Sequence, residues 1–219
     1  MNLQENFFQK SSLLWPFVFV PITLYAAKTF GHLAATLLLS ALFFYLFVFK
    51  AERKTRRLMI VLAVFSAAFE TANVGAGLYS YPGTIGAPLW ISIGWAVLGW
   101  WLASLEKQFS KISFKTSFAV ISLLLVAFPL YNNSFSVNSA MAIAGLYMLS
   151  LCISQPFSLY AFTALFAMVV EYSGTVTGVW NYFNLNGTNG IVPADLAYLA
   201  LAYSLILAFC FWISGYEKK

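Results

Sequence analysis

The chain has 219 residues, of which 61% are hydrophobic and only 9% are charged. Soluble proteins carry about 25% charged residues, so this composition excludes an ordinary soluble domain and predicts an integral membrane protein. The net charge of +5 comes from short cationic clusters between apolar runs, which is typical of topology signals and argues against nucleic-acid binding. The apolar runs have the length of membrane helices, and they lack the alternating pattern of β-barrel strands.

The apolar segments predict an all-α polytopic membrane protein with a single membrane domain over residues 1–219. Each segment is close to the roughly 20 residues that a helix needs to cross a hydrocarbon core. The fifth and sixth segments are short, so seven spans remain an alternative to eight. The predicted spans are 13–30, 33–49, 58–79, 87–105, 116–131, 139–154, 157–180 and 193–214.

The positions of Lys and Arg predict how these spans are oriented. Loops with excess Lys and Arg stay on the cytoplasmic side, whereas the loops at 80–86, 132–138 and 181–192 carry no charge and are expected outside. Both chain termini are then cytoplasmic, and the cytoplasmic membrane of a prokaryote is the expected location. The cations on the inner side would be Lys10, Lys50, Arg53, Lys54, Arg56, Arg57, Lys107, Lys111, Lys115, Lys218 and Lys219.

A segment at 69–90, FETANVGAGLYSYPGTIGAPLW, is echoed at 170–195 by VEYSGTVTGVWNYFNLNGTNGIVPAD. The likeness predicts two parallel four-helix repeats, at about 13–105 and 116–214, related by an axis along the membrane normal. On a helix, offsets of seven and eleven residues return to one face, so we expect the acid, the glycine and the last tyrosine to form one stripe. The matched pairs are Glu70 with Glu171, Gly77 with Gly178, Tyr79 with Trp180, and Tyr81 with Tyr182.

Three acidic residues are the candidates for catalysis. Glu70 and Glu171 fall inside predicted spans, and Asp195 falls at the outer mouth of the last span. A carboxyl group costs a few kcal/mol to place in hydrocarbon, so it faces a cavity or a partner. The alternative is that each acid has a structural role and forms a hydrogen bond that holds two helices together. The remaining acids, Glu5, Glu52, Glu106 and Glu217, are expected in loops or tails.

Several neighbours of these acids are candidates for substrate binding. Asn73 and Thr175 lie one turn from the two glutamates, where a side-chain hydrogen bond is possible. Gly77 and Gly178 allow close approach of a helix or a ligand, and Trp95 walls a cavity or faces lipid. The sequence has one histidine and no phosphate-binding glycine loop, so we expect neither a metal site nor a cofactor. The aromatic candidates are Tyr79, Tyr81, Trp180 and Tyr182.

The first block, with its acid, glycine, Tyr-Ser-Tyr, Gly-x-Pro and tryptophan, resembles a membrane carotenoid-biosynthesis family that includes bisanhydrobacterioruberin hydratases. The second block is also similar to the heterodimer-type lycopene cyclase domains, although Asp195 stands alone where those domains carry paired acids. Together the blocks cover about fifty residues.

The resemblance implies a non-redox lyase or isomerase that protonates a double bond of a lipophilic isoprenoid substrate, followed by hydration or cyclisation. It implies that Glu171 or Glu70 donates the proton and that Asp195 is the base or orients water. Tyr81, Tyr182 and Trp180 would line the outer mouth. No cofactor is implied, because neither reaction changes the redox state of the substrate.

Two other classes of function remain open from the residues alone. Intramembrane acids in repeated segments are also common in proton-coupled transporters of small solutes or lipids. A non-catalytic membrane scaffold would use both acids as structural posts. A cavity shared by Glu70 and Glu171 would favour the enzyme.

Overall fold

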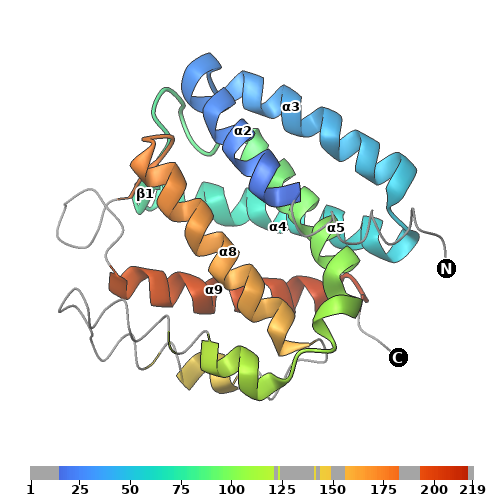
Figure 1. Ribbon diagram of the computed structural model, residues 1–219. Helices are drawn as coiled ribbons and strands as arrows, with labels where there is room; N and C mark the ends of the chain where they lie inside the picture. Colours follow the sequence, from blue (N-terminus) through green and yellow to red (C-terminus); the bar gives the residue numbers. More distant parts are fainter. Residues whose placement is uncertain are drawn as a thin grey trace.

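The computed structural model describes residues 15–120, 123, 141, 144–148, 156–182 and 193–216. Within these ranges only the backbone is described for residues 107, 108, 164, 168, 182 and 193–200. The predicted spans at 116–131 and 139–154 therefore lie largely outside the described residues. The described part of the chain is mostly helical (Figure 1), as the apolar runs predict.

Four helical stretches in the described residues are long and apolar enough to cross a membrane, namely His32–Lys50, Arg53–Gly75, Leu89–Glu106 and Phe157–Val176. This confirms the expectation of a mostly helical chain with several candidate membrane spans. The helices are α2 (Trp15–Phe30), α3 (His32–Tyr45) with the π-helical turn η1 (Leu46–Lys50), α4 (Arg53–Gly75), α5 (Leu89–Phe109), α8 (Phe157–Val176) and α9 (Pro193–Ile213).

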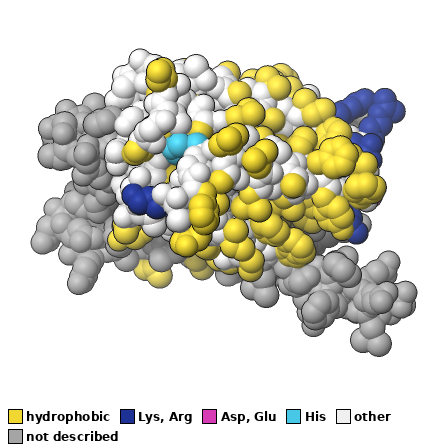
Figure 2. Space-filling view, turned by 90° about the horizontal axis from the view of Figure 1, so that it is seen from above, with side chains coloured by type: hydrophobic (Ala, Val, Ile, Leu, Met, Phe, Trp, Pro, Cys, Tyr) yellow, Lys and Arg dark blue, Asp and Glu magenta, His cyan; other side chains and the backbone are white. Residues whose placement is uncertain are grey.

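The outer surface of these helices is apolar in the way that a lipid-facing surface requires. Leu33, Leu37, Val64 and Val169 are each more than half exposed. Figure 2 shows one such hydrophobic face, with most of its Lys and Arg side chains gathered at one end of the molecule. An apolar surface with most of its cations at one end agrees with the Lys and Arg clusters that the sequence places between apolar runs.

The described helices pack around one extended core. α4 packs along α5, α8 packs along α9, and α2 and α3 lie over the outer side of α5 (Figure 1). Contacts of α4 with α9 and of α5 with α8 join the early helices to the late ones. The core between them is dominated by aromatic and leucine side chains, among them Leu58, Leu62, Trp101, Tyr160 and Phe211.

α4 and α8 end in the same way, and both end before the predicted boundaries at residues 79 and 180. Gly77 has φ 72° and Gly178 has φ 69°, a left-handed conformation that stops an α-helix. In each case the next residue returns a hydrogen bond to the last turn, from Leu78 N–H to the carbonyl of Asn73 at 3.0 Å and from Val179 N–H to that of Gly174 at 2.9 Å.

The expected helical stripe of acid, glycine and tyrosine is therefore wrong. The left-handed glycines turn the chain out of both helices, and the aromatic residues follow on short strands, β1 (Tyr79–Ser80) and β2 (Asn181–Tyr182). These strands pair antiparallel, with Tyr79 opposite Tyr182 and Ser80 opposite Asn181. Ser80 and Asn181 hold equivalent positions in the two related segments. The two segments therefore pair with each other through equivalent residues.

The opposite end of the bundle is closed by a basic turn. The N–H of Ala51 donates to the carbonyl of Leu46 at 2.8 Å, which completes η1. Arg56 donates from Nε to the Ala51 carbonyl at 2.9 Å and from Nη2 to the Val48 carbonyl at 3.1 Å. Glu106, expected in a loop, instead lies inside α5 and is buried, because that helix continues past its apolar run to Phe109.

Candidate functional site

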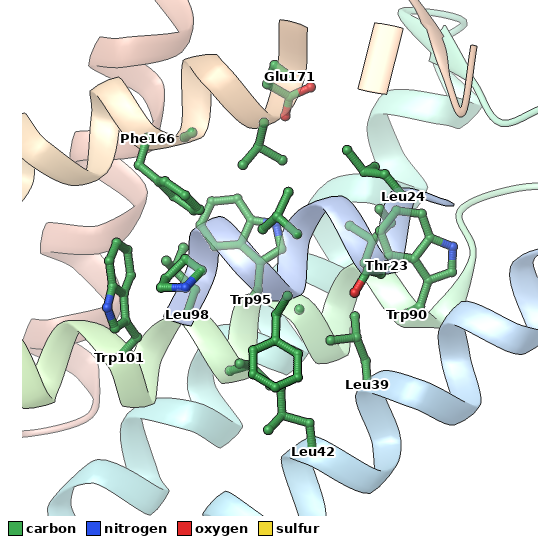
Figure 3. A pocket seen from close by; sticks show the side chains of 18 of the residues that line it. Thr23, Leu24, Leu39, Leu42, Trp90, Trp95, Leu98, Trp101, Phe166 and Glu171 are labelled. Carbon is green, nitrogen blue, oxygen red and sulfur yellow. The ribbon is translucent and has the colours of Figure 1, made fainter. Parts of the chain in front are cut away.

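One cavity lies between α2, α3, α4, α5, α8 and α9, and both Glu70 and Glu171 border it. Figure 3 shows Glu171 with other residues of its lining. The empty space amounts to about 1110 Å³, including the part that is open to the outside of the protein. Its walls are almost entirely apolar. The side chains used below are Thr23, Glu70, Tyr81, Trp90, Trp95, Trp101, Phe166, Glu171, Trp180 and Tyr203.

The cavity is elongated along α5. Its lining on this helix runs from Trp90 to Trp101, which is about 16 Å of helix at 1.5 Å per residue. Figure 3 shows Trp90 and Thr23 toward one end and Trp101 and Phe166 toward the other. Such a shape accommodates a chain-like apolar ligand better than a compact polar solute.

Glu70 is buried at 5% exposure and is surrounded by hydrogen-bond donors. The hydroxyl of Tyr79 donates to Oε2, and the hydroxyl of Tyr81 donates to the same oxygen at 3.0 Å. Trp95 lines the same cavity as this carboxyl. The two tyrosine hydroxyls therefore share one carboxyl oxygen as their acceptor.

Glu171 is only half-buried and lies on the other side of the cavity, on α8. The hydroxyl of Tyr203, from α9, donates to Oε1 of this carboxyl. The Tyr203 ring stacks on Trp95 with ring centroids 5.1 Å apart. Trp95 and Tyr203 line the cavity together with both acids.

Tyr79 and Tyr81 follow α4, outside the membrane-spanning helices, and both are protonated donors. Burial raises the pKa of each phenol above its ordinary value, and the Glu70 carboxyl raises it further. Glu171 adds to the upward pKa shift of both phenols. The two acids therefore act on the same pair of tyrosines.

His32 forms hydrogen bonds with the loop between β1 and α5 and with Trp90, at one end of the cavity. Its Nε2 lies 2.9 Å from the carbonyl of Pro82, and its Nδ1 accepts from the Trp90 indole at 3.1 Å. A carbonyl only accepts and an indole N–H only donates, so His32 carries its proton on Nε2. The rings of Tyr81 and Trp90 each lie within 6.2 Å of the Trp180 ring, which completes an aromatic cover.

Five of the residues predicted for the site border the cavity, namely Glu70, Glu171, Tyr81, Trp95 and Trp180. The lipid-facing alternative for Trp95 is wrong, because its side chain is 9% exposed and packs inside the bundle. The side chains of Asp195 and Tyr182 lie outside the described residues, so their predicted roles stay predictions.

The other predicted residues support the site from outside the cavity. Asn73 interacts with the Tyr79 hydroxyl rather than with Glu70. Thr175 donates to the main-chain carbonyl of Glu171 at 2.9 Å, not to its carboxyl. Gly77 and Gly178 end their helices in a left-handed conformation, and neither lines this cavity.

Sequence reasoning missed Tyr203 and Thr23. Both are polar side chains within apolar helices, which is the only signal that could have singled them out. Neither belongs to the repeated motif, and their contact with the cavity depends on how α2 and α9 pack.

The residues that the structure describes contain no group of His, Cys, Asp and Glu side chains placed to hold a metal ion. The cavity instead offers two carboxyls, phenol and indole donors, and aromatic faces. Carboxyls beside aromatic faces suit proton transfer with stabilisation of a cation. No protein-family model matches the chain, and no curated protein or solved structure matches it either.

Proposed function

We propose that the protein is an integral membrane enzyme that protonates a carbon–carbon double bond of an isoprenoid lipid. The observation that carries the proposal is the single apolar cavity bordered by both Glu70 and Glu171. A scaffold would pack each acid against its helix neighbours, without an elongated space between the two carboxyls.

The walls of the cavity match the needs of carbocation chemistry. A protonated polyene carries positive charge, and the faces of Trp and Tyr rings attract a cation at close range. Trp95, Trp180, Tyr81 and Tyr203 surround the space between the acids. The apolar wall excludes bulk water, which would otherwise quench the cation before the intended step.

The two acids are proposed to have different roles. Glu171 donates the proton, because it is half-buried and borders the cavity. Glu70, whose carboxyl accepts the hydroxyls of Tyr79 and Tyr81, is assigned the role of accepting the proton released at the end. Protonation followed by loss of another proton gives a cyclised isomer, whereas capture of water followed by loss of its proton gives an alcohol.

The finer architecture belongs to the same proposal. Eight spans in two parallel repeats, with both termini in the cytoplasm of a prokaryote, would put α4 and α8 in equivalent places. The matched helix ends and the β1–β2 pairing support this arrangement. The carotenoid-family resemblance supports a polyene as the isoprenoid.

The test is expression in bacteria that accumulate lycopene or another acyclic polyene, followed by chromatography and mass spectrometry of the pigments. We expect a new species that is either an isomer or heavier by one water. Glu171→Gln and Glu70→Gln should insert normally and lose about 100-fold or more of the activity, as expected for removal of an acid or base. Glu52→Gln, at an exposed site before α4, is the matched control.

Full activity in both cavity variants would overturn the proposal. Unchanged pigments across several polyenes, hydroxylated ones included, would also overturn it. In that case, pH-dependent solute uptake into proteoliposomes would favour the transporter.

A further inference from the structure

Two buried polar atoms on the cavity wall have no hydrogen-bond partner among the described residues. They are Oγ1 of Thr23 and Nε1 of Trp180, and each residue is only 4% exposed. Leaving a buried polar group unpaired costs about 1–3 kcal/mol. Two such groups on one apolar cavity therefore indicate that a bound molecule supplies the missing partner.

Thr23 differs from four other threonines in the described helices. Thr36, Thr71, Thr163 and Thr175 each donate to the carbonyl four residues earlier, at 2.7–2.9 Å. That bond satisfies a hydroxyl within its own helix. Thr23 makes no such bond, although it lies within α2 and the residue four positions earlier is also helical.

Trp180 departs from its counterpart in the related segment. Tyr79, at the equivalent position, donates its hydroxyl to Glu70. The indole of Trp180 instead leans on Gly174, where a Cβ would overlap the ring, and its N–H has no acceptor. The first segment therefore uses the Tyr79 hydroxyl to bind Glu70, whereas the equivalent Trp180 N–H of the second segment has no acceptor.

From these observations we propose that the natural ligand is an isoprenoid lipid with a neutral oxygen function, a hydroxyl or a carbonyl, bound between Thr23 and Trp180. The Trp180 N–H donates to that oxygen, and the Thr23 hydroxyl donates to it or accepts from it. The group is neutral because no cationic side chain lines the cavity. This inference rests on the proposal that the cavity binds an isoprenoid, and it names the substrate class.

The ligand then lies with a defined polarity. Thr23, Trp90 and Trp180 lie at one end of the cavity, near the loop whose Pro82 carbonyl binds His32, whereas Trp101 and Phe166 lie at the far end. The oxygen function is bound at the Thr23 end, and the hydrocarbon chain extends from there along α5. A pure hydrocarbon would leave both polar groups unpaired and would bind more weakly.

The test compares geranylgeraniol with the hydrocarbon that lacks its hydroxyl, both binding to the protein in nanodiscs. Quenching of tryptophan fluorescence gives both dissociation constants. Two hydrogen bonds of ordinary strength predict about a tenfold preference for the alcohol. Thr23→Val and Trp180→Phe should each reduce that preference about threefold or more and leave hydrocarbon binding nearly unchanged.

The matched controls are Thr71→Val and Trp212→Phe, whose side chains are exposed on α4 and α9. Equal affinity of the wild-type protein for the two compounds would overturn the inference, because the polar pair would then hold only water. An unchanged preference in both cavity variants would also overturn it. Glu171→Gln should keep the preference, so a failure of catalysis is distinguished from a failure of ligand recognition.

Discussion

The rings of Trp95 and Tyr203 stack with centroids 5.1 Å apart on the wall of the cavity that both glutamates border. The Tyr203 hydroxyl donates to Glu171. The stacked pair joins α5 to α9, and it holds in place the ring whose hydroxyl binds Glu171.

Removing the Tyr203 hydroxyl should weaken the protein and leave the aromatic stack in place. Tyr203→Phe deletes one hydrogen bond to a carboxyl, worth about 1.5–3 kcal/mol. Trp95→Phe replaces the buried indole of the stack by a smaller ring and weakens the stack itself. We expect each variant to unfold at lower temperature in detergent, and the double variant to lose less than the sum, since the contacts are coupled. Tyr25→Phe, on an exposed side chain, is the control. Strict additivity would contradict the coupling.

The left-handed glycines make a second prediction. Gly77→Ala and Gly178→Ala force a Cβ into φ near 70° and should each lower the free energy of unfolding by about 1–2 kcal/mol. The Cβ of Gly178→Ala would lie 3.2 Å from Nζ of Lys28, a flexible side chain that can move aside, so the two variants should cost about the same. Gly75→Ala, at a helical position with open space around it, should be neutral or stabilising. Equal thermal stability of all three variants would contradict this.

Gly174 sets the position of the Trp180 indole. A Cβ at this residue would overlap the ring, and the clash can be relieved only by moving the indole or α8. Gly174→Ala should therefore shift the tryptophan emission and lower activity severalfold, with a destabilisation of about 1–3 kcal/mol for overpacking. Unchanged emission and activity would show that the indole is not seated on this glycine.

Alkaline pH should destabilise the protein through Tyr79 and Tyr81. Burial raises the pKa of both phenols, so the folded state holds their protons more tightly than the unfolded chain does. Their contribution to stability is complete below the unfolded pKa of about 10 and declines as pH rises above it. The double variant Tyr79→Phe/Tyr81→Phe should show a smaller decline in melting temperature above about pH 10. An identical decline would contradict the pKa shift, and Tyr172→Phe, at an exposed site, is the control.

The sequence predicts much of the site because its strongest signal is local. The repeated segment singles out Glu70 and Glu171, and both border the cavity. The ends of α4 and α8 are missed because apolar character continues through Gly77 and Gly178, where backbone conformation rather than hydropathy stops the helix.

Tyr203 and Thr23 are missed for a different reason. Each lies in an apolar helix whose rotation is set by packing against distant segments, and no local pattern records that rotation. Glu106 is misplaced because α5 extends beyond its apolar run.

The most direct test of the central claim is deuterium incorporation during turnover. Membranes containing the protein are incubated with an acyclic polyene in D₂O, and the product is analysed by mass spectrometry. Protonation of a double bond by an enzyme acid predicts carbon-bound deuterium in the product, with product formation lost in Glu171→Gln. Product without carbon-bound deuterium, or labelled product formed at the wild-type rate by both Glu70→Gln and Glu171→Gln, would contradict the account.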